Sequence, residues 1–220
     1  LHPVQQALVD YHGSQCGFCT PGFVMSLFAG WLNEHSFTGA ELDDLLSGNL
    51  CRCTGYGPIV RAAESLAQNS CQPWENERIL HEKGFLESCR SLPALSYDVG
   101  NYFYTAPDSI DGVSMAYLAQ PDAQIVAGAT DIGVWINKQN KKLSKLISIQ
   151  DVSDLSKVTE SDDGIFIGAS TTHQEAAKRL SVRFADMGEL WRRFGSVQVR
   201  SNGTVGGNIA NGSPIGDLAP

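Results

Sequence analysis

The stretch QCGFC, residues 15–19, and the shorter stretch CRC, residues 51–53, place four cysteines in two closely spaced pairs near the start of this 220-residue chain. Four thiolates in a confined space suit a soft metal centre, which is either an iron–sulfur cluster or a tetrahedral zinc ion. The two centres predict different functions, because an iron–sulfur cluster moves electrons whereas a closed zinc site stabilises a fold. The cysteine spacing alone leaves both open.

The sequence around the cysteines predicts helices. Apolar stripes and terminal signals indicate helices at Val4–Tyr11, Pro21–Leu32, Leu42–Leu46 and Ile59–Ala67. The third of these follows Thr38-Gly39-Ala40-Glu41, which has the pattern of a capping box. Each cysteine pair then lies in a loop between two helices. Two such helical hairpins, packed antiparallel, would bring both loops to one end of a small bundle and all four thiols to one site.

The texture of the sequence changes further along the chain. Residues 71–98 show no sustained period and are predicted to be a linker with a short helix around Glu77–Glu87. From about Tyr102 strands and helices are expected to alternate. The expected strands are Gln124–Ala127, Lys145–Ile149 and Gly164–Gly168, and the expected helices are the one that Ser109 caps, Gln174–Leu180 and Ala185–Phe194. The predicted organisation is therefore a helical domain over residues 1–70, a linker over 71–98 and a second domain over 99–220.

Two glycine-containing loops of the second domain are candidates for phosphate binding. Residues 127–131, AGATD, follow a predicted strand and open a helix, so backbone N–H groups there can face an anion. Residues 202–208, NGTVGGN, hold three glycines, where a chain turns sharply or approaches a ligand closely. Neither loop matches the dinucleotide fingerprint G-x-G-x-x-G or the P-loop. Each loop taken separately is therefore a weak signal.

Composition limits the classes of partner and compartment. The chain is 42% hydrophobic and 18% charged, with a net charge of −8 and a pI near 5.0. An acidic protein of this kind is not expected to bind nucleic acid or an anionic membrane. No apolar run approaches the roughly 20 residues that span a bilayer. Reduced cysteines at ligand spacing indicate the cytoplasm. The chain begins without methionine and ends after a glycine-rich loop, and we expect it to be a fragment of a longer protein.

The motifs together resemble one family. The stretches IVAGATDI (125–132) and VRSNGTVGGNIANGSPIGD (199–217) are similar to the two flavin-binding segments of the FAD domain in molybdenum hydroxylases. The stretches QCGFCTPG and GNLCRCTGY resemble the ligand loops of the all-helical [2Fe–2S] domain of the same family. The resemblance is to the small iron–sulfur plus FAD subunit of a bacterial enzyme of the xanthine dehydrogenase type. It implies a multidomain α plus α/β fold, in which an all-α four-helix [2Fe–2S] domain precedes the N-terminal part of an α+β FAD-binding domain of the PCMH type.

The resemblance also implies cofactor-binding residues. Cys16, Cys19, Cys51 and Cys53 would each give a thiolate to one [2Fe–2S] cluster, and Gln15 and Cys53 would lie close to a molybdopterin cofactor. The residues implied for FAD are Ile125, Val126, Ala127, Gly128, Ala129, Thr130, Asp131, Ile132, Phe194, Thr204, Val205, Gly206, Gly207, Asn208 and Asp217. No residue of the chain is expected to be catalytic, and each of the five histidines is interpreted as a surface or capping residue.

The implied function is electron transfer. The chain would be the oxidoreductase component that passes electrons from molybdopterin in a large partner subunit through [2Fe–2S] to FAD, and then to NAD or another acceptor, during purine hydroxylation. The resemblance further implies a hetero-oligomer and a second [2Fe–2S] cluster in a domain that would precede Leu1. An aldehyde oxidase-type or other molybdenum hydroxylase is the nearest alternative. A zinc-stapled binding protein without a redox role is the alternative from another class. The substrate, the acceptor and the stoichiometry are not encoded in these residues.

Overall fold

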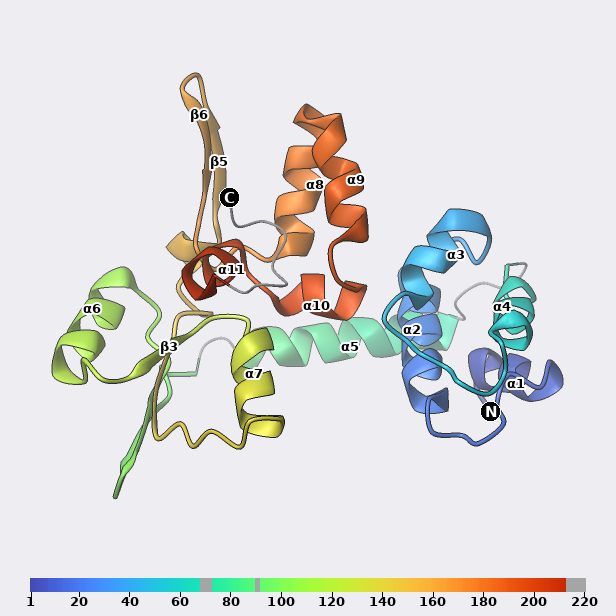
Figure 1. Ribbon diagram of the computed structural model, residues 1–220, viewed down its shortest axis with the longest axis horizontal. Coiled ribbons are helices and arrows are strands. Elements are labelled where there is room, and N and C mark those ends of the chain that lie inside the picture. The colour runs from blue at the N-terminus through green and yellow to red at the C-terminus, as the bar shows by residue number, and fades with distance from the viewer. Residues whose placement is uncertain (68–72, 90–91, 213–220) are drawn as a thin grey trace. The chain divides into compact units, whose positions relative to one another are not determined.

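The computed structural model describes residues 1–67, 73–89 and 92–212, and it divides the chain into two compact units, Leu1–Leu92 and Pro93–Pro220 (Figure 1). The first unit is helical and the second mixes helices with β-strands. This is the multidomain fold class that the sequence predicts. Among the described residues, no helix combines the length and the hydrophobicity that a bilayer-spanning segment needs.

The first unit contains helices where the apolar stripes predict them. Helices α1 and α2 (Pro3–Asp10, Thr20–Leu32) flank the loop with Cys16 and Cys19, and helices α3 and α4 (Gly39–Leu46, Gly57–Glu64) flank the loop with Cys51 and Cys53. Helix α1 packs against α4 and α2, and α2 packs against α3. Both cysteine loops therefore connect helices that share one core.

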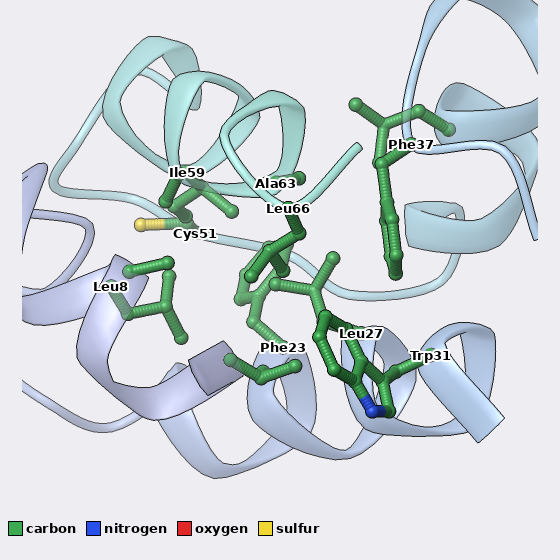
Figure 2. Packing of buried hydrophobic residues seen from close by; sticks show 13 residues of the cluster. Leu8, Phe23, Leu27, Trp31, Phe37, Cys51, Ile59, Ala63 and Leu66 are labelled. Carbon is green, nitrogen blue, oxygen red and sulfur yellow. The ribbon is translucent and has the colours of Figure 1, made fainter. Parts of the chain in front are cut away.

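That core consists of large apolar side chains from all four helices. Phe23 and Leu27 of α2, Leu42 of α3 and Ile59 of α4 are at most 1% exposed. Figure 2 shows these helices meeting around Phe23, Leu27 and Ile59, with the side chain of Cys51 at the edge of the cluster. Full burial of one such side chain stabilises the fold by about 1.5–3 kcal/mol. The helices are thus held by their shared apolar faces.

The capping box predicted at the start of α3 does not form, so this prediction is wrong. Thr38 is the N-cap residue, as expected, but its side chain makes no capping bond to the helix. Its hydroxyl instead contacts the Ser36 hydroxyl at 3.0 Å, and the carboxylate of Glu41 accepts from the Ser36 N–H at 3.2 Å. A capping box forms at α1, where the imidazole of His2 accepts from Val4 N–H and Gln5 accepts from His2 N–H. Histidine is an uncommon N-cap, so the pattern did not reveal it.

The helix expected near Glu77–Glu87 is present and longer than predicted, as α5 (Pro73–Cys89). Its first turn carries Glu75, which is 4% exposed. One carboxylate oxygen of Glu75 lies 2.6 Å from Nε2 of His2, and the other accepts from Trp31 Nε1 at 3.2 Å. A buried carboxylate requires such partners. These two bonds fasten the start of α5 to α1 and α2.

The second unit begins with a four-stranded sheet in the order β1-β2-β4-β3. Strand β2 (Tyr102–Thr105) pairs antiparallel with β1 (Ser96–Val99) and parallel with β4 (Lys145–Ser148), which also pairs parallel with β3 (Gln124–Val126). Helix α6 (Ile110–Ala119) connects β2 to β3, and α7 (Thr130–Asn137) connects β3 to β4. Parallel strands need such crossover helices. The sequence analysis missed β1 and β2.

The rest of the described second unit is a hairpin followed by helices. Strands β5 and β6 (Val158–Ser161, Gly164–Ile167) form the hairpin after the short 3₁₀-helix η1 (Ser153–Ser156). Helices α8 and α9 (His173–Arg183, Ala185–Arg193) pack on each other, and α10 (Val197–Asn202) packs on α8. Helix α11 (Val205–Asn211) ends the described chain. A small apolar cluster around Leu180, Trp191 and Phe194 joins these helices to β6.

The buried carboxylate of Glu75 predicts a stability effect. The Glu75→Ala substitution should lower the free energy of unfolding of the first unit by about 1–3 kcal/mol, because it leaves the buried Trp31 N–H without this acceptor. The matched substitution Glu77→Ala, on an exposed position of the same helix, should change it by less than about 0.5 kcal/mol. Urea unfolding followed by the loss of helical circular dichroism measures both, and equal midpoints would contradict the role of Glu75.

Candidate functional site

The four predicted cysteine ligands occupy two depths in the first unit. Cys51 is 8% exposed and belongs to the hydrophobic core, and Cys19, at the N-cap of α2, packs against that core. Cys16 and Cys53 are exposed. The two loops therefore each supply one inner and one outer cysteine. No sequence pattern distinguishes these two depths.

The thiols meet across the loops in two pairs. The thiols of Cys16 and Cys53 lie close enough to shift each other's pKa, and so do the thiols of Cys19 and Cys51. Each contact joins residues that are more than thirty positions apart in the sequence. The helical hairpins thus bring both loops together, as the sequence analysis expected of them. The outer cysteines form one pair and the inner cysteines form the other.

Hydrogen bonds lower the thiol pKa of one cysteine in each pair. The Thr54 hydroxyl, at 3.1 Å, and the Thr54 N–H, at 3.4 Å, both contact the Cys51 sulfur and lower the pKa of Cys51 to about 7. The Phe18 N–H is the main cause that lowers the pKa of Cys16. Burial raises the pKa of Cys19, and the hydrogen bond to Cys16 raises that of Cys53. Metal ligands are thiolates, and N–H groups directed at the sulfurs tune a bound centre.

Four cysteine thiols from two neighbouring loops are a donor set for an iron–sulfur cluster or for a zinc ion. A structural zinc ion takes four ligands around one centre. A [2Fe–2S] cluster instead shares four cysteine thiolates between two irons. Four sulfur donors in two contacting pairs therefore fit this cluster.

The loops that carry the cysteines expose both polar and apolar side chains. Gln15, directly before Cys16, is exposed. Phe18, between the two cysteines of the first loop, is 95% exposed, and Leu50, directly before Cys51, is 82% exposed. An exposed apolar side chain is common by itself. Two of them beside a candidate redox centre mark this surface as a candidate contact for a partner.

The second candidate site is a cavity of about 740 Å³ in the second unit. Its walls come from β3, the start of α7, the start of α8, the residue after α9, and α11 with the loop before it. Residues of both glycine-containing loops that the sequence singles out line this one cavity. A cavity of this size is typical of a small-molecule or cofactor site.

Close packing of Gly128 on the second loop brings the two loops together. A Cβ atom at Gly128 would lie 1.6 Å from the carbonyl oxygen of Asn202, so only glycine fits. Further along, the Asn211 side chain donates to the Asp131 carboxylate at 2.8 Å. Asp131 therefore binds the end of α11, and its carboxylate need not face a phosphate. The sequence analysis placed this glycine in a ligand-binding loop and did not predict its packing against Asn202.

The two loops offer different chemistry to a ligand. In α7 the first intrahelical bond runs from Gly133 N–H to Ala129 O, so the N–H groups of residues 130–132 precede the hydrogen-bond ladder. In the second loop Val205 N–H donates to Thr171 O and Gly206 N–H to Ala169 O, at 3.0 and 3.1 Å. The glycine at 206 serves this contact, since a Cβ there would lie 2.6 Å from Ala169 O. Within the described residues, the N–H groups that begin α11 donate to acceptors outside the helix, whereas no such acceptor is seen for those that begin α7.

Most residues that the resemblance implies for FAD line the cavity. These are Ile125, Ala127, Gly128, Ala129, Thr130, Asp131, Ile132, Phe194, Thr204, Gly206, Gly207 and Asn208. Val126 is not among the lining residues, and Val205 packs on the apolar cluster of the second unit. Asp217 lies outside the described residues. Ile125, on the predicted strand, is 41% exposed.

Sequence reasoning missed part of the lining. Tyr117, Trp135, His173, Val199 and Asn211 also line the cavity. The interpretation of His173 as a surface or capping residue is wrong, because it is 2% exposed and Thr172 is the N-cap of α8. Its position at a helix start, after Thr171-Thr172, resembles a cap in the sequence. Only the packing of α8 against residues 203–205 buries it.

The lining suits a flavin nucleotide. Unused N–H groups at the start of α7 can face a diphosphate, and apolar and aromatic walls can face ring systems. Two buried polar atoms of lining residues, Nδ1 of His173 and Oδ1 of Asn208, have no hydrogen-bond partner among the described residues. Buried polar atoms normally have partners. A polar ligand in the cavity would supply them.

Comparison with family models assigns both units. The model "FAD binding domain in molybdopterin dehydrogenase" matches residues 97–220, more than half of the chain. The model "[2Fe-2S] binding domain" matches residues 1–64. The first match covers both glycine-containing loops, and the second covers all four paired cysteines.

Individual proteins that the chain resembles include xanthine dehydrogenases and a CO dehydrogenase. Xanthine dehydrogenase of Drosophila subobscura is 28% identical over the whole chain, and xanthine dehydrogenase 2 of Arabidopsis thaliana is 30% identical. The chain spans 20% and 21% of the lengths of these two relatives. The reconstituted CO dehydrogenase from Oligotropha carboxidovorans is a solved structure with 28% identity and a TM-score of 0.49, over 56% of this chain and 44% of that one. By the two family models, the chain belongs to the molybdopterin dehydrogenase family, with a [2Fe-2S] binding domain followed by the FAD binding domain.

Proposed function

We propose that this chain is the electron-transfer part of a molybdenum hydroxylase of the xanthine dehydrogenase type. It passes electrons from a molybdopterin centre in a partner subunit or domain, through a [2Fe–2S] cluster, to FAD and then to NAD or another acceptor. When bound, the cluster and the flavin supply the redox chemistry. The relatives named xanthine dehydrogenase support a purine substrate. The chain's own residues bind and orient the cofactors.

The observation that carries this proposal is the pairing of four thiols across two loops. Cys16 with Cys53 and Cys19 with Cys51 give two pairs of sulfur donors at one end of the helical core. This arrangement suits the two irons of a redox cluster. A protein that used zinc only to hold its fold would need four ligands on one ion.

The two sides of the cysteine site differ, because one pair adjoins the core and the other is exposed. The inner pair adjoins the core, which excludes water and lowers the local dielectric, whereas the outer pair faces solvent. The outer pair is thus the side from which a partner can approach. We place the molybdopterin-binding partner on the exposed residues Gln15, Phe18 and Leu50, because they neighbour the cysteines in the sequence and two of them are apolar.

We assign the flavin to the cavity of the second unit. The start of α7 provides donors for the diphosphate, and Asn208 and Thr204 provide polar side chains from the other glycine-containing loop. Phe194, 6% exposed, forms part of the apolar wall. No lining residue is proposed to be catalytic, since the chemistry of substrate oxidation belongs to the molybdopterin-binding partner.

The cluster assignment predicts the effect of removing one inner thiolate. The wild-type chain, purified without oxygen, should contain about two irons and two sulfides and absorb in the visible range. The Cys51→Ser substitution should abolish both, because one iron loses a ligand. Cys89→Ser, at the end of α5, should leave them unchanged. Wild-type protein with zinc and no sulfide, or an unaltered iron content and EPR spectrum in Cys51→Ser, would refute the assignment.

The contact between the glycine-containing loops predicts a specific loss of FAD affinity. Gly128→Ala should weaken FAD binding about tenfold and lower stability by about 1–3 kcal/mol, because its Cβ would meet the Asn202 carbonyl and separate the loops. Gly133→Ala is the matched control, since a Cβ there would meet nothing within 4 Å. Quenching of FAD fluorescence gives both affinities. Equal affinities of the two variants would place the flavin elsewhere.

The proposed partner surface makes a third prediction. Phe18→Ser should reduce recovery of the molybdopterin-binding subunit with a tagged, coexpressed chain about tenfold, because a fully exposed aromatic side chain in an interface contributes strongly to binding. Phe85→Ser, on α5 and 60% exposed, should leave recovery unchanged. Iron content of both variants checks that the cluster is retained. Full recovery with Phe18→Ser would exclude this surface as the contact.

A further inference from the structure

His173 is a buried titratable residue at the wall of the cavity in the second unit. It is the first residue of α8, and its exposed fraction is 2%. Neither its burial nor its place beside the glycine-containing loops is visible in the sequence. Burial lowers the pKa of its imidazole, which favours the neutral ring. A neutral imidazole carries one N–H donor and one acceptor nitrogen.

The backbone and the ring of His173 are both fixed. Its N–H donates to Gly203 O at 2.9 Å, and the preceding residue forms a β-bridge with Thr204. The imidazole lies 4.6 Å from the Phe194 ring, between centroids, at an interplanar angle of 57°. Phe194 and Gly203 also line the cavity. The ring is therefore held at the wall by two of the elements that build the site.

One ring nitrogen of this fixed histidine is unpaired. Nδ1 is buried and has no hydrogen-bond partner within the described part of the chain. Oδ1 of Asn208, which lines the same cavity, is in the same condition. A core histidine kept only for packing would be expected to pair both nitrogens or to be replaced by an apolar residue. The unpaired nitrogen belongs to a residue that lines the cavity, so a ligand bound there is the nearest source of a partner.

We propose that His173 is a binding residue for the flavin nucleotide, whose polar atoms form a hydrogen bond with the imidazole of His173 beside Phe194. This proposal rests on the proposed function, because it takes the cavity to be the FAD site. It adds a side chain that the glycine-containing loops do not contain. The interaction is non-covalent, and His173 transfers neither a proton nor an electron in it.

Two substitutions separate the hydrogen bond from packing. His173→Phe keeps a ring against Phe194 but removes both nitrogens, and it should weaken FAD binding about three- to tenfold. His173→Asn keeps a polar atom close to the position of Nδ1 and should restore most of the affinity. FAD fluorescence quenching with the full chain measures these values. If His173→Phe binds FAD as tightly as wild type, the proposal is wrong.

A direct measurement covers the case in which a variant folds poorly. In the wild-type chain labelled with ¹⁵N at histidine, addition of FAD should shift one imidazole pair of resonances, and that pair should be missing from His173→Asn. FAD binding that leaves this pair unmoved would overturn the proposal while the function stands. A wild-type chain with its cluster but without affinity for FAD would refute the flavin assignment itself.

Discussion

The shared hydrophobic core of α1 to α4 is the constraint on which the cysteine site depends. Phe23, Leu27 and Ile59 fix helices that begin or end beside the two cysteine loops, so their packing sets the distance between the loops. Two thiols that are more than thirty residues apart in the sequence come close only if these helices pack correctly. Cys51 makes this link directly, because it belongs to the core and also contacts Cys19. Fold stability and cofactor geometry are therefore coupled in this unit.

In the second unit, backbone contacts hold the segments around the cavity together, where the first unit uses a large hydrophobic core. Gly128 against Asn202, and the N–H of Gly206 against Ala169, bring together segments that enclose the cavity. These contacts use the backbone donors of the second loop, which leaves the start of α7 as the place with unused N–H groups. The two loops look alike in the sequence, but one builds the site and the other can bind an anion.

Local signals predicted much of this structure. The helices around the cysteines, the strand before residue 127 and the cap at Ser109, whose hydroxyl accepts from Gly112 N–H at 3.3 Å, are present because short-range periodicity and capping determine them. Strands β1, β2 and β5 were missed because they are short and lack a marked apolar period. Thr38 was assigned the correct position but the wrong hydrogen bond, since its hydroxyl found a nearer partner in Ser36.

The sequence by itself determined which residues are chemically able to hold the cofactors, because cysteine spacing and glycine-containing loops are local properties of the chain. Only the tertiary structure decided how these residues are grouped. It paired Cys16 with Cys53 and Cys19 with Cys51, and it buried His173 at a cavity wall. Those outcomes depend on contacts between segments far apart in the sequence. Burial and pairing of this kind arise from packing, and no short stretch of residues encodes them.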